Sequence, residues 1–248
     1  MKIQLYNDDC LNAMKNIPDK SVDLILTDLP YGFTDCEWDI IIPFDKMWEE
    51  FKRVLKKGGT VALFGDNGLF TAKLILSNEK WFKYNWVWKK HRGIGFLNCK
   101  YQPLRNIESI SIFQNPDAKK DERIYNPQMG KGKPYHKSEY KILKSDSVYK
   151  QKIRTECNND GTRYPTQVLE FKSLSRTVHP TQKPVDLLEY LIKTYTDEGM
   201  TVLDATMGSG STMVACINTN RNGIGIELDN DYFNISKTRI EEAKNDLQ

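Results

Sequence analysis

The sequence lacks several features that would assign it to common classes of protein. It has no C-x-x-C pair, and its five cysteines are scattered at Cys10, Cys36, Cys99, Cys157 and Cys216. An odd count without paired spacing predicts reduced thiols in a cytosolic setting and no metal site of the structural zinc type. No apolar run approaches the ~20 residues that a membrane-spanning helix needs. The early charges at the N-terminus leave no apolar stretch of the kind found in signal peptides.

Charge is distributed unevenly along the 248 residues. The net charge is only +3, but residues 83–176 contain 20 Lys and Arg against 9 Asp and Glu, a net of +11, and the rest of the chain has a net of −8. Basic residues interleaved with aromatic ones suit a face that binds a polyanion, since Lys and Arg neutralise phosphates and flat rings stack on bases. Charge alone leaves a plain solvated surface as an equal alternative.

Strands and helices alternate along most of the chain. The apolar patterns predict strands at 3–6, 22–27, 60–64, 84–88, 201–203 and 222–227, and helices at 11–16, 43–55, 69–76, 185–195, 211–217 and 231–244. Such alternation predicts an α/β protein, with a doubly wound, mostly parallel sheet covered by helices on both faces. The periodicity is lost over residues 114–176, which we interpret as a segment inserted between residues 1–113 and 177–248 of one domain.

A glycine-containing loop, Asp204-Ala205-Thr206-Met207-Gly208-Ser209-Gly210-Ser211-Thr212, links a predicted strand to a predicted helix. Glycines let the backbone approach a ligand closely, and the helix start presents free N–H groups. Met213 replaces the third glycine of the dinucleotide fingerprint, and no G-x-x-x-x-G-K-[ST] motif is present. Asp204 would repel a pyrophosphate but attract a cationic centre, and Glu227 after the next strand suits ribose hydroxyls. S-adenosylmethionine fits these features, although a packing loop of an α/β protein can look similar.

The tetrapeptide Asp28-Leu29-Pro30-Tyr31 follows a buried strand, so it is expected at the same edge of the sheet as the glycine loop. An exocyclic amine of a base is a poor nucleophile, and two acceptors must hold its hydrogens so that its lone pair points at a methyl group. The Asp28 carboxylate and a backbone carbonyl, that of Leu29, suit this task, and Tyr31 offers a ring for a flipped base to stack on. Taken alone, the tetrapeptide also fits a rigid turn with a surface tyrosine.

Together these motifs resemble those of the amino-group DNA methyltransferases that modify adenine N6 or cytosine N4. Asp28-Leu29-Pro30-Tyr31 matches the family's D/N/S-P-P-Y motif, and the glycine loop matches its methyl-donor loop. The order, with the catalytic motif first, resembles the permuted β group. His179-Pro180-Thr181-Gln182-Lys183-Pro184 resembles the segment that precedes the donor loop in that group. Leu29 departs from the family's first proline, and Ala205-Thr206 stands where Pro-Phe is frequent.

The resemblance implies a Rossmann-like methyltransferase fold with a seven-stranded sheet, S-adenosylmethionine as cofactor and double-stranded DNA as substrate. It implies that the inserted segment recognises the DNA target, and an aspartate at the first motif position indicates adenine N6. The expected catalytic residues are Asp28, Leu29, Pro30 and Tyr31. The expected cofactor-binding residues are Asp9, Cys10, Asp28, Thr181, Gln182, Lys183, Asp204, Thr206, Gly208, Gly210, Ser211 and Glu227. The expected DNA-binding residues are Lys89, Lys90, Arg92, Lys100 and Arg105.

Three other readings of the sequence stay open. Within the same class, cytosine N4 is the alternative target. A nucleic-acid-binding module with a decayed active site is disfavoured by the intact Asp28, Tyr31, Gly208, Gly210 and Glu227, and a nucleotide-dependent oxidoreductase by the missing third glycine. We also expect a homodimer, a companion restriction endonuclease and a cytoplasmic, nucleoid-associated protein of prokaryotic or phage origin.

Overall fold

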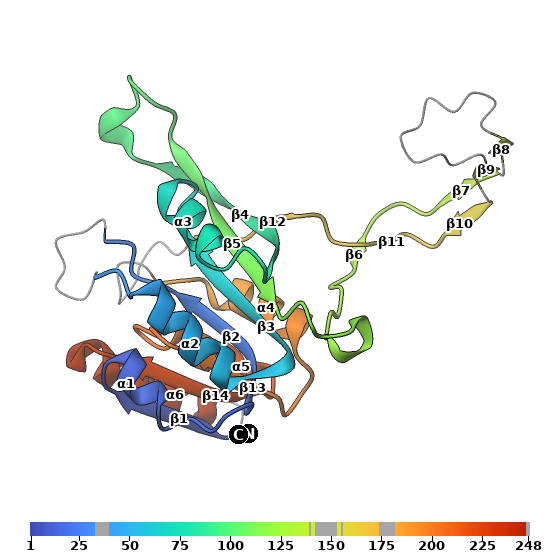
Figure 1. The fold of residues 1–248 in the computed structure, drawn as a ribbon. Coiled ribbons are helices and arrows are strands. Elements are labelled where there is room, and N and C mark those ends of the chain that lie inside the picture. The colour runs from blue at the N-terminus through green and yellow to red at the C-terminus, as the bar shows by residue number, and fades with distance from the viewer. Residues whose placement is uncertain (33–39, 139, 142–152, 155, 174–181, 247–248) are drawn as a thin grey trace. The chain divides into compact units, whose positions relative to one another are not determined.

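The computed structural model describes residues 1–32, 40–138, 140–141, 153–154, 156–173 and 182–246. The chain forms two compact units. The larger contains Met1–Asn126 and Gln167–Gln248, and the smaller contains Pro127–Thr166. The smaller unit is shorter than the inserted segment of residues 114–176 expected from the sequence, because residues 114–126 and those from 167 onward belong to the larger unit. Figure 1 shows the ribbon of both units.

An eight-stranded sheet forms the centre of the larger unit, with the strand order β1-β14-β13-β2-β3-β5-β4-β12. Its strands are β1 (Ile3–Asn7), β2 (Val22–Asp28), β3 (Leu55–Gly65), β4 (Phe82–Ile94), β5 (Arg105–Gln114), β12 (Val168–Glu170), β13 (Thr201–Asp204) and β14 (Asn222–Glu227). The five strands from β1 to β3 in this order are parallel, whereas β5 is antiparallel to both β3 and β4. The carboxyl ends of β2, β13 and β14 therefore lie at one edge of the sheet, where ligands bind in doubly wound folds.

Helices cover both faces of this sheet (Figure 1). On one face, α1 (Cys10–Met14), α2 (Phe44–Val54) and α3 (Leu69–Ser77) pack over a core that includes Met14, Phe51 and Leu74. On the other, α4 (Val185–Tyr195), α5 (Ser211–Asn218) and α6 (Asn230–Asn245) pack over a core that includes Leu191 and Met213. The two cores lie on opposite sides of buried parallel strands, which explains the nearly continuous apolar sequence of β2.

The α/β class and the mostly parallel sheet are as expected, and so are the six predicted helices to within two residues at each end. Two strands of the sheet were not expected. β5 was missed, although its Ser109-Ile110-Ser111-Ile112 alternates as a strand should. β12 pairs in parallel with β4 and brings the sheet to eight strands instead of seven. Gly58 and Gly59, which follow α2 closely in the sequence, lie inside β3.

The smaller unit contains only short strands. β6 (Gly130–Lys131) pairs with β11 (Thr162–Arg163), β7 (Tyr135–Lys137) with β10 (Cys157–Asn159), and β8 (Tyr140–Lys141) with β9 (Ile153–Arg154), all antiparallel. Most of the residues of this unit that the structure describes are exposed to solvent. A unit of this kind has little core of its own.

In neither unit does a helix of the described chain have the length and apolar character that crossing a membrane requires. Among the described residues there is also no group of three or more His, Cys, Asp or Glu side chains arranged to hold a metal ion.

Candidate active site

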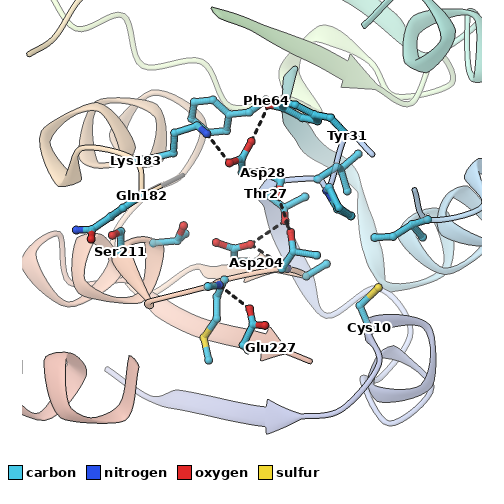
Figure 2. Close-up of a pocket in the computed structure, with 18 of the residues that line it drawn as sticks. Cys10, Thr27, Asp28, Tyr31, Phe64, Gln182, Lys183, Asp204, Ser211 and Glu227 are labelled. Carbon is cyan, nitrogen blue, oxygen red and sulfur yellow. Dashed lines mark hydrogen bonds and ion pairs between the residues drawn. The ribbon is translucent and has the colours of Figure 1, made fainter. Parts of the chain in front are cut away.

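A cavity of about 580 Å³ opens at the carboxyl edge of the parallel strands. Its lining comes from segments remote in the chain: the turn after β1, the tetrapeptide after β2, the glycine loop after β13 and the end of β14. Figure 2 shows side chains from these segments pointing toward one another around a common space. The cavity lies wholly within the larger unit.

Asp28 is the last residue of β2, and its carboxylate holds two donors. The Tyr31 hydroxyl donates to Asp28 Oδ1 at 2.7 Å, and the Lys183 ammonium group donates to Oδ2 in an ion pair (Figure 2). The Tyr31 ring lies against Phe70, with 4.6 Å between the ring centroids. The turn that Pro30 rigidifies thus places the Tyr31 hydroxyl beside the Asp28 carboxylate, three residues earlier in the chain. Leu29, Pro30 and Tyr31 all line the cavity.

Burial and charge act against each other at this carboxylate. Burial raises the pKa of the Asp28 carboxyl group above its ordinary value, although the Lys183 ammonium group opposes the shift. For Lys183, burial alone would lower the pKa, but the Asp28 and Glu108 carboxylates outweigh it and raise the pKa. Burial also raises the pKa of Tyr31, and the Asp28 charge adds to the shift, so the phenol stays protonated and remains a donor.

The glycine loop reaches the cavity through backbone conformations that glycine adopts readily. Gly208 and Gly210 have φ angles of 52° and 79°, in the left-handed region. A Cβ at Gly210 would also lie 2.9 Å from Ser236 Cβ of α6, so a side chain has no room there. Arg239 of α6 donates to the Ser209 carbonyl and to the Ser211 hydroxyl, which fixes the loop against the start of α5.

Glu227, at the end of β14, is held by backbone donors. Its Oε2 accepts from Gly208 N at 2.7 Å and its Oε1 from Asp229 N at 2.8 Å. Burial raises the pKa of Glu227, and these two N–H groups oppose the shift. Each carboxylate oxygen keeps a further lone pair, so Glu227 can still accept hydrogen bonds from hydroxyl groups of a ligand.

Hydrogen bonds join the tetrapeptide to the glycine loop. Thr27 Oγ1 donates to Asp204 Oδ1 at 2.7 Å, and Thr206 Oγ1 donates to the Asp28 carbonyl at 2.9 Å. The two hydroxyl oxygens are 2.8 Å apart. Asp204 is almost fully buried, and burial raises its pKa to about 6, against the opposing hydrogen bonds of Thr212 and Thr27. Two segments separated by 177 residues in sequence are therefore built into one site.

Most of the expected cofactor-binding residues are brought together. Gly210 does not line the cavity and instead turns the chain into α5, while Thr181, like His179 and Pro180, lies outside the described residues. Asp9 lines the wall and also caps α1, accepting from Leu11 N at 3.0 Å. The other residues of this set that line the cavity are Cys10, Asp28, Gln182, Lys183, Asp204, Thr206, Gly208, Ser211 and Glu227.

The expected DNA-binding residues fall into two groups. Arg92, Lys100 and Arg105 are exposed on the β4–β5 hairpin and its connection, and Lys89 is exposed but paired with Glu170 at 2.8 Å. Lys90 points inward: it lines the cavity, forms an ion pair with Glu108 and lies 4.9 Å from the centroid of the Trp88 ring. Trp86 and Trp88 are buried in the hydrophobic core.

Sequence reasoning missed several residues of the cavity wall, above all Glu108 of β5, which contacts Lys90 and Lys183. It also missed Thr27 and Phe64, each of which is the last residue but one of its strand, β2 and β3 respectively. The available signal was the period of two in β4, because Trp86, Trp88 and Lys90 alternate on one face and Lys90 therefore faces the buried side.

Comparison with known proteins agrees with this site. The family model described as DNA methylase matches residues 22–238. The chain is 30% identical to the Type II methyltransferase M.HpaI of Haemophilus parainfluenzae over 99% of this chain and 76% of that one. Among solved structures, the M1.HpyAVI–SAM complex has a TM-score of 0.67 at 24% identity, covering 96% of this chain and 98% of its own. The cytosine-N4-specific PvuII DNA methyltransferase has a TM-score of 0.69 at 14% identity, with coverage of 99% and 92%. The chain belongs to the DNA methylase family, whose members methylate N6 or N4 amino groups, as its motifs led us to expect.

Proposed function

We propose that this protein is a site-specific DNA methyltransferase that transfers a methyl group from S-adenosylmethionine to the N6 amino group of adenine. One observation carries the proposal: the Asp28 tetrapeptide and the Asp204 glycine loop meet in one cavity, joined by the Thr206 hydroxyl on the Asp28 carbonyl. A base and a methyl donor bound to these two segments are neighbours. Proximity and orientation of this kind supply much of the rate of a transfer between two bound reactants.

The cavity fits the proposed donor by its chemistry. Glu227 keeps lone pairs for ribose hydroxyls, and the Gly208 backbone can lie close to a ligand. Asp204 lies in the wall with a pKa of about 6, so near neutral pH it is largely ionised and attracts a positive centre. The absence of a lysine from the glycine loop agrees with a ligand that has no phosphate chain. When bound, S-adenosylmethionine supplies an electrophilic methyl group.

The protein's own residues then orient the target amine. The Asp28 carboxylate and the Leu29 carbonyl accept hydrogen bonds from its two hydrogens, which turns the nitrogen lone pair toward the donor. Tyr31 lies at the same wall and offers its ring to the extruded base. Preorganised acceptors act here without needing a strong base, because the solvent does not have to reorganise during transfer.

Adenine is proposed over cytosine because Asp28 occupies the first position of the tetrapeptide, as the resemblance implies for adenine enzymes. Nucleoside analysis of DNA methylated by the purified protein tests this choice. N6-methyladenine is the expected product, and N4-methylcytosine would establish the alternative instead. Failure to transfer a labelled methyl group to any DNA would reject the activity.

We propose the smaller unit and the β4–β5 hairpin as the parts that contact DNA. Residues 127–166 contain 9 Lys and Arg against 4 Asp and Glu, and the hairpin exposes Arg92, Lys100 and Arg105. The Type II names of the relatives support a companion restriction endonuclease. Long-read modification mapping of DNA from cells that express the chain would give the methylated base and the recognition sequence together. The homodimer stays a prediction, to be tested by measuring the mass of the protein in solution.

A further inference from the structure

Four charges of alternating sign form a row on the cavity wall. Asp28 is paired with Lys183, Lys183 Nζ lies 3.6 Å from Glu108 Oε2, and Glu108 Oε1 is paired with Lys90. Lys183 and Glu108 are both largely buried, with side-chain exposures of 10% and 19%. The row begins at Asp28, the residue proposed to orient the base, and ends at Lys90 of β4. Its third member, Glu108, lies on β5, the strand that the sequence did not reveal. Lys183 is among the expected cofactor-binding residues, whereas Glu108 and Lys90 have no role in the mechanism described above.

Each oxygen of the Asp28 carboxylate already accepts one hydrogen bond. The Tyr31 hydroxyl is on Oδ1 and the Lys183 ammonium group is on Oδ2. An ammonium group is a stronger donor to a carboxylate than the neutral amino group of a base, because the bond is assisted by charge. Each oxygen keeps a further lone pair, but the paired ammonium group offsets the negative charge of Asp28 and so makes it a weaker acceptor for the target amine while Lys183 keeps this position.

Glu108 offers Lys183 a second partner. Its Oε2 is buried and makes no hydrogen bond with any residue that the structure describes, whereas Oε1 is engaged by Lys90. A buried ammonium group that lost Asp28 without replacement would be strongly destabilised. A shift of about an ångström, from the 3.6 Å separation to hydrogen-bonding distance, would keep Lys183 paired. The Phe64 ring, 5.0 Å from Lys183 Nζ, offers further cation–π stabilisation nearby.

We propose that Glu108 is a positioning residue for methyl transfer: it takes Lys183 from Asp28 when the target amine enters, so that Asp28 Oδ2 accepts a hydrogen bond from the amine. The row of charges keeps its order, and no proton changes place. This inference rests on the proposed function and adds to it the residue that makes the acceptor available. Lys90 stays paired with Glu108 Oε1 throughout and so keeps the Glu108 side chain in place.

Glu108→Gln tests the proposal, because it keeps the size of the side chain and removes the charge that attracts Lys183. We expect the single-turnover rate of transfer at saturating DNA and donor to fall about tenfold or more, while the KM for DNA and the equilibrium donor affinity stay within about twofold. A rate equal to that of the unmodified protein would overturn the proposal. The matched control is Glu241→Gln, which makes the same charge change on the exposed face of α6.

A double variant separates this role from a structural one. If the loss in Glu108→Gln arises because Lys183 remains on Asp28, then Lys183→Met should cost less in the Glu108→Gln background than in the unmodified protein. Losses that simply multiply would contradict the proposal, since Lys183 would then act independently of Glu108. A change in donor affinity equal to the loss of rate would contradict it too, because it would place Glu108 in donor binding.

Glu108→Asp keeps the inference testable if Glu108→Gln does not fold. The aspartate keeps the charge, but its side chain is one methylene shorter. We therefore expect the single-turnover rate to fall by only about threefold. Full activity in this variant would overturn the proposal. These outcomes differ from failure of the proposed function, in which the unmodified protein itself transfers no methyl group.

Discussion

The parallel and antiparallel halves of the sheet contribute different residues to the site. The parallel half, from β1 to β3 in the sheet order, supplies Asp28, Asp204 and Glu227 from the carboxyl ends of its strands. The antiparallel half supplies Glu108 from β5 and Lys90 from β4, both from positions within their strands. In the parallel half, topology brings the functional residues together. In the antiparallel half, only the alternation of side chains between the two faces decides which residues point into the site.

Each half of the sheet thus contributes a different kind of residue. The parallel half provides the side chains that contact the proposed ligands. The antiparallel half provides the charges of Glu108 and Lys90 beside those side chains, and a hairpin that exposes basic residues. We therefore expect substitutions in the parallel half to stop transfer or donor binding, and those in the antiparallel half to change rate or DNA affinity by smaller factors.

The largest effect is expected from Asp28→Ala. Transfer of a labelled methyl group should fall by about 10³-fold or more, because an acceptor of the amine is lost, while donor binding by calorimetry is retained. Asp117→Ala, in an exposed position after β5, is the matched control. Undiminished methylation by Asp28→Ala would remove the tetrapeptide from the mechanism.

Asp204→Asn should weaken donor binding, because it removes a negative charge from the cavity wall, and should remove one source of the pH dependence of stability. Burial raises the Asp204 pKa from 3.8 to about 6, so its ionisation opposes folding as pH rises through that interval. Below about pH 4 the group is protonated in both the folded and the unfolded chain and has no such effect. Between about pH 4 and neutral pH, the unfolding free energy of the unmodified protein should therefore fall by about 3 kcal/mol relative to that of the variant.

Urea unfolding at a series of pH values measures this difference. The difference between the unfolding free energies of the two proteins should change between about pH 4 and pH 6, with the unmodified protein losing stability relative to the variant as the pH rises. Parallel curves over this range would show that Asp204 does not titrate as its burial requires.

Glu227→Gln should reduce donor affinity by about 10- to 100-fold, because an amide nitrogen cannot accept from the Gly208 or Asp229 N–H and a charged acceptor is lost. Calorimetric titration with S-adenosylmethionine measures the change. Glu198→Gln, exposed near Asn220, is the control. An unchanged affinity would place the donor elsewhere in the cavity.

The smallest effects are expected on the hairpin. Lys100→Gln and Arg105→Gln should each weaken DNA binding by a few-fold at moderate salt and lower the slope of log affinity against log salt by about 1. Lys237→Gln, exposed on α6, is the control. The same substitutions should leave donor affinity unchanged. Slopes equal to that of the control would exclude this part of the hairpin from the DNA contact.

The parallel half could be predicted closely from the sequence, whereas the antiparallel half could not. Val22 to Thr27 is buried on both sides and its apolar run identifies β2, and the tetrapeptide and glycine loop follow their strands directly. β5 was missed because its serines and Glu108 interrupt the apolar pattern, and Glu108 was missed with it. Lys90 was expected on the surface because a lysine usually is, and its inward direction depends on its partner Glu108.

The position of β2 between β13 and β3 has a consequence for the order of assembly. During translation β2 and β3 emerge early, but the strand that must pair with the other side of β2 is made only much later, since Thr27 and Asp204 are 177 residues apart. Until then one edge of β2 is unpaired and open to non-native partners. The tetrapeptide is thus synthesised long before the glycine loop. The site therefore cannot form until β13 has emerged from the ribosome.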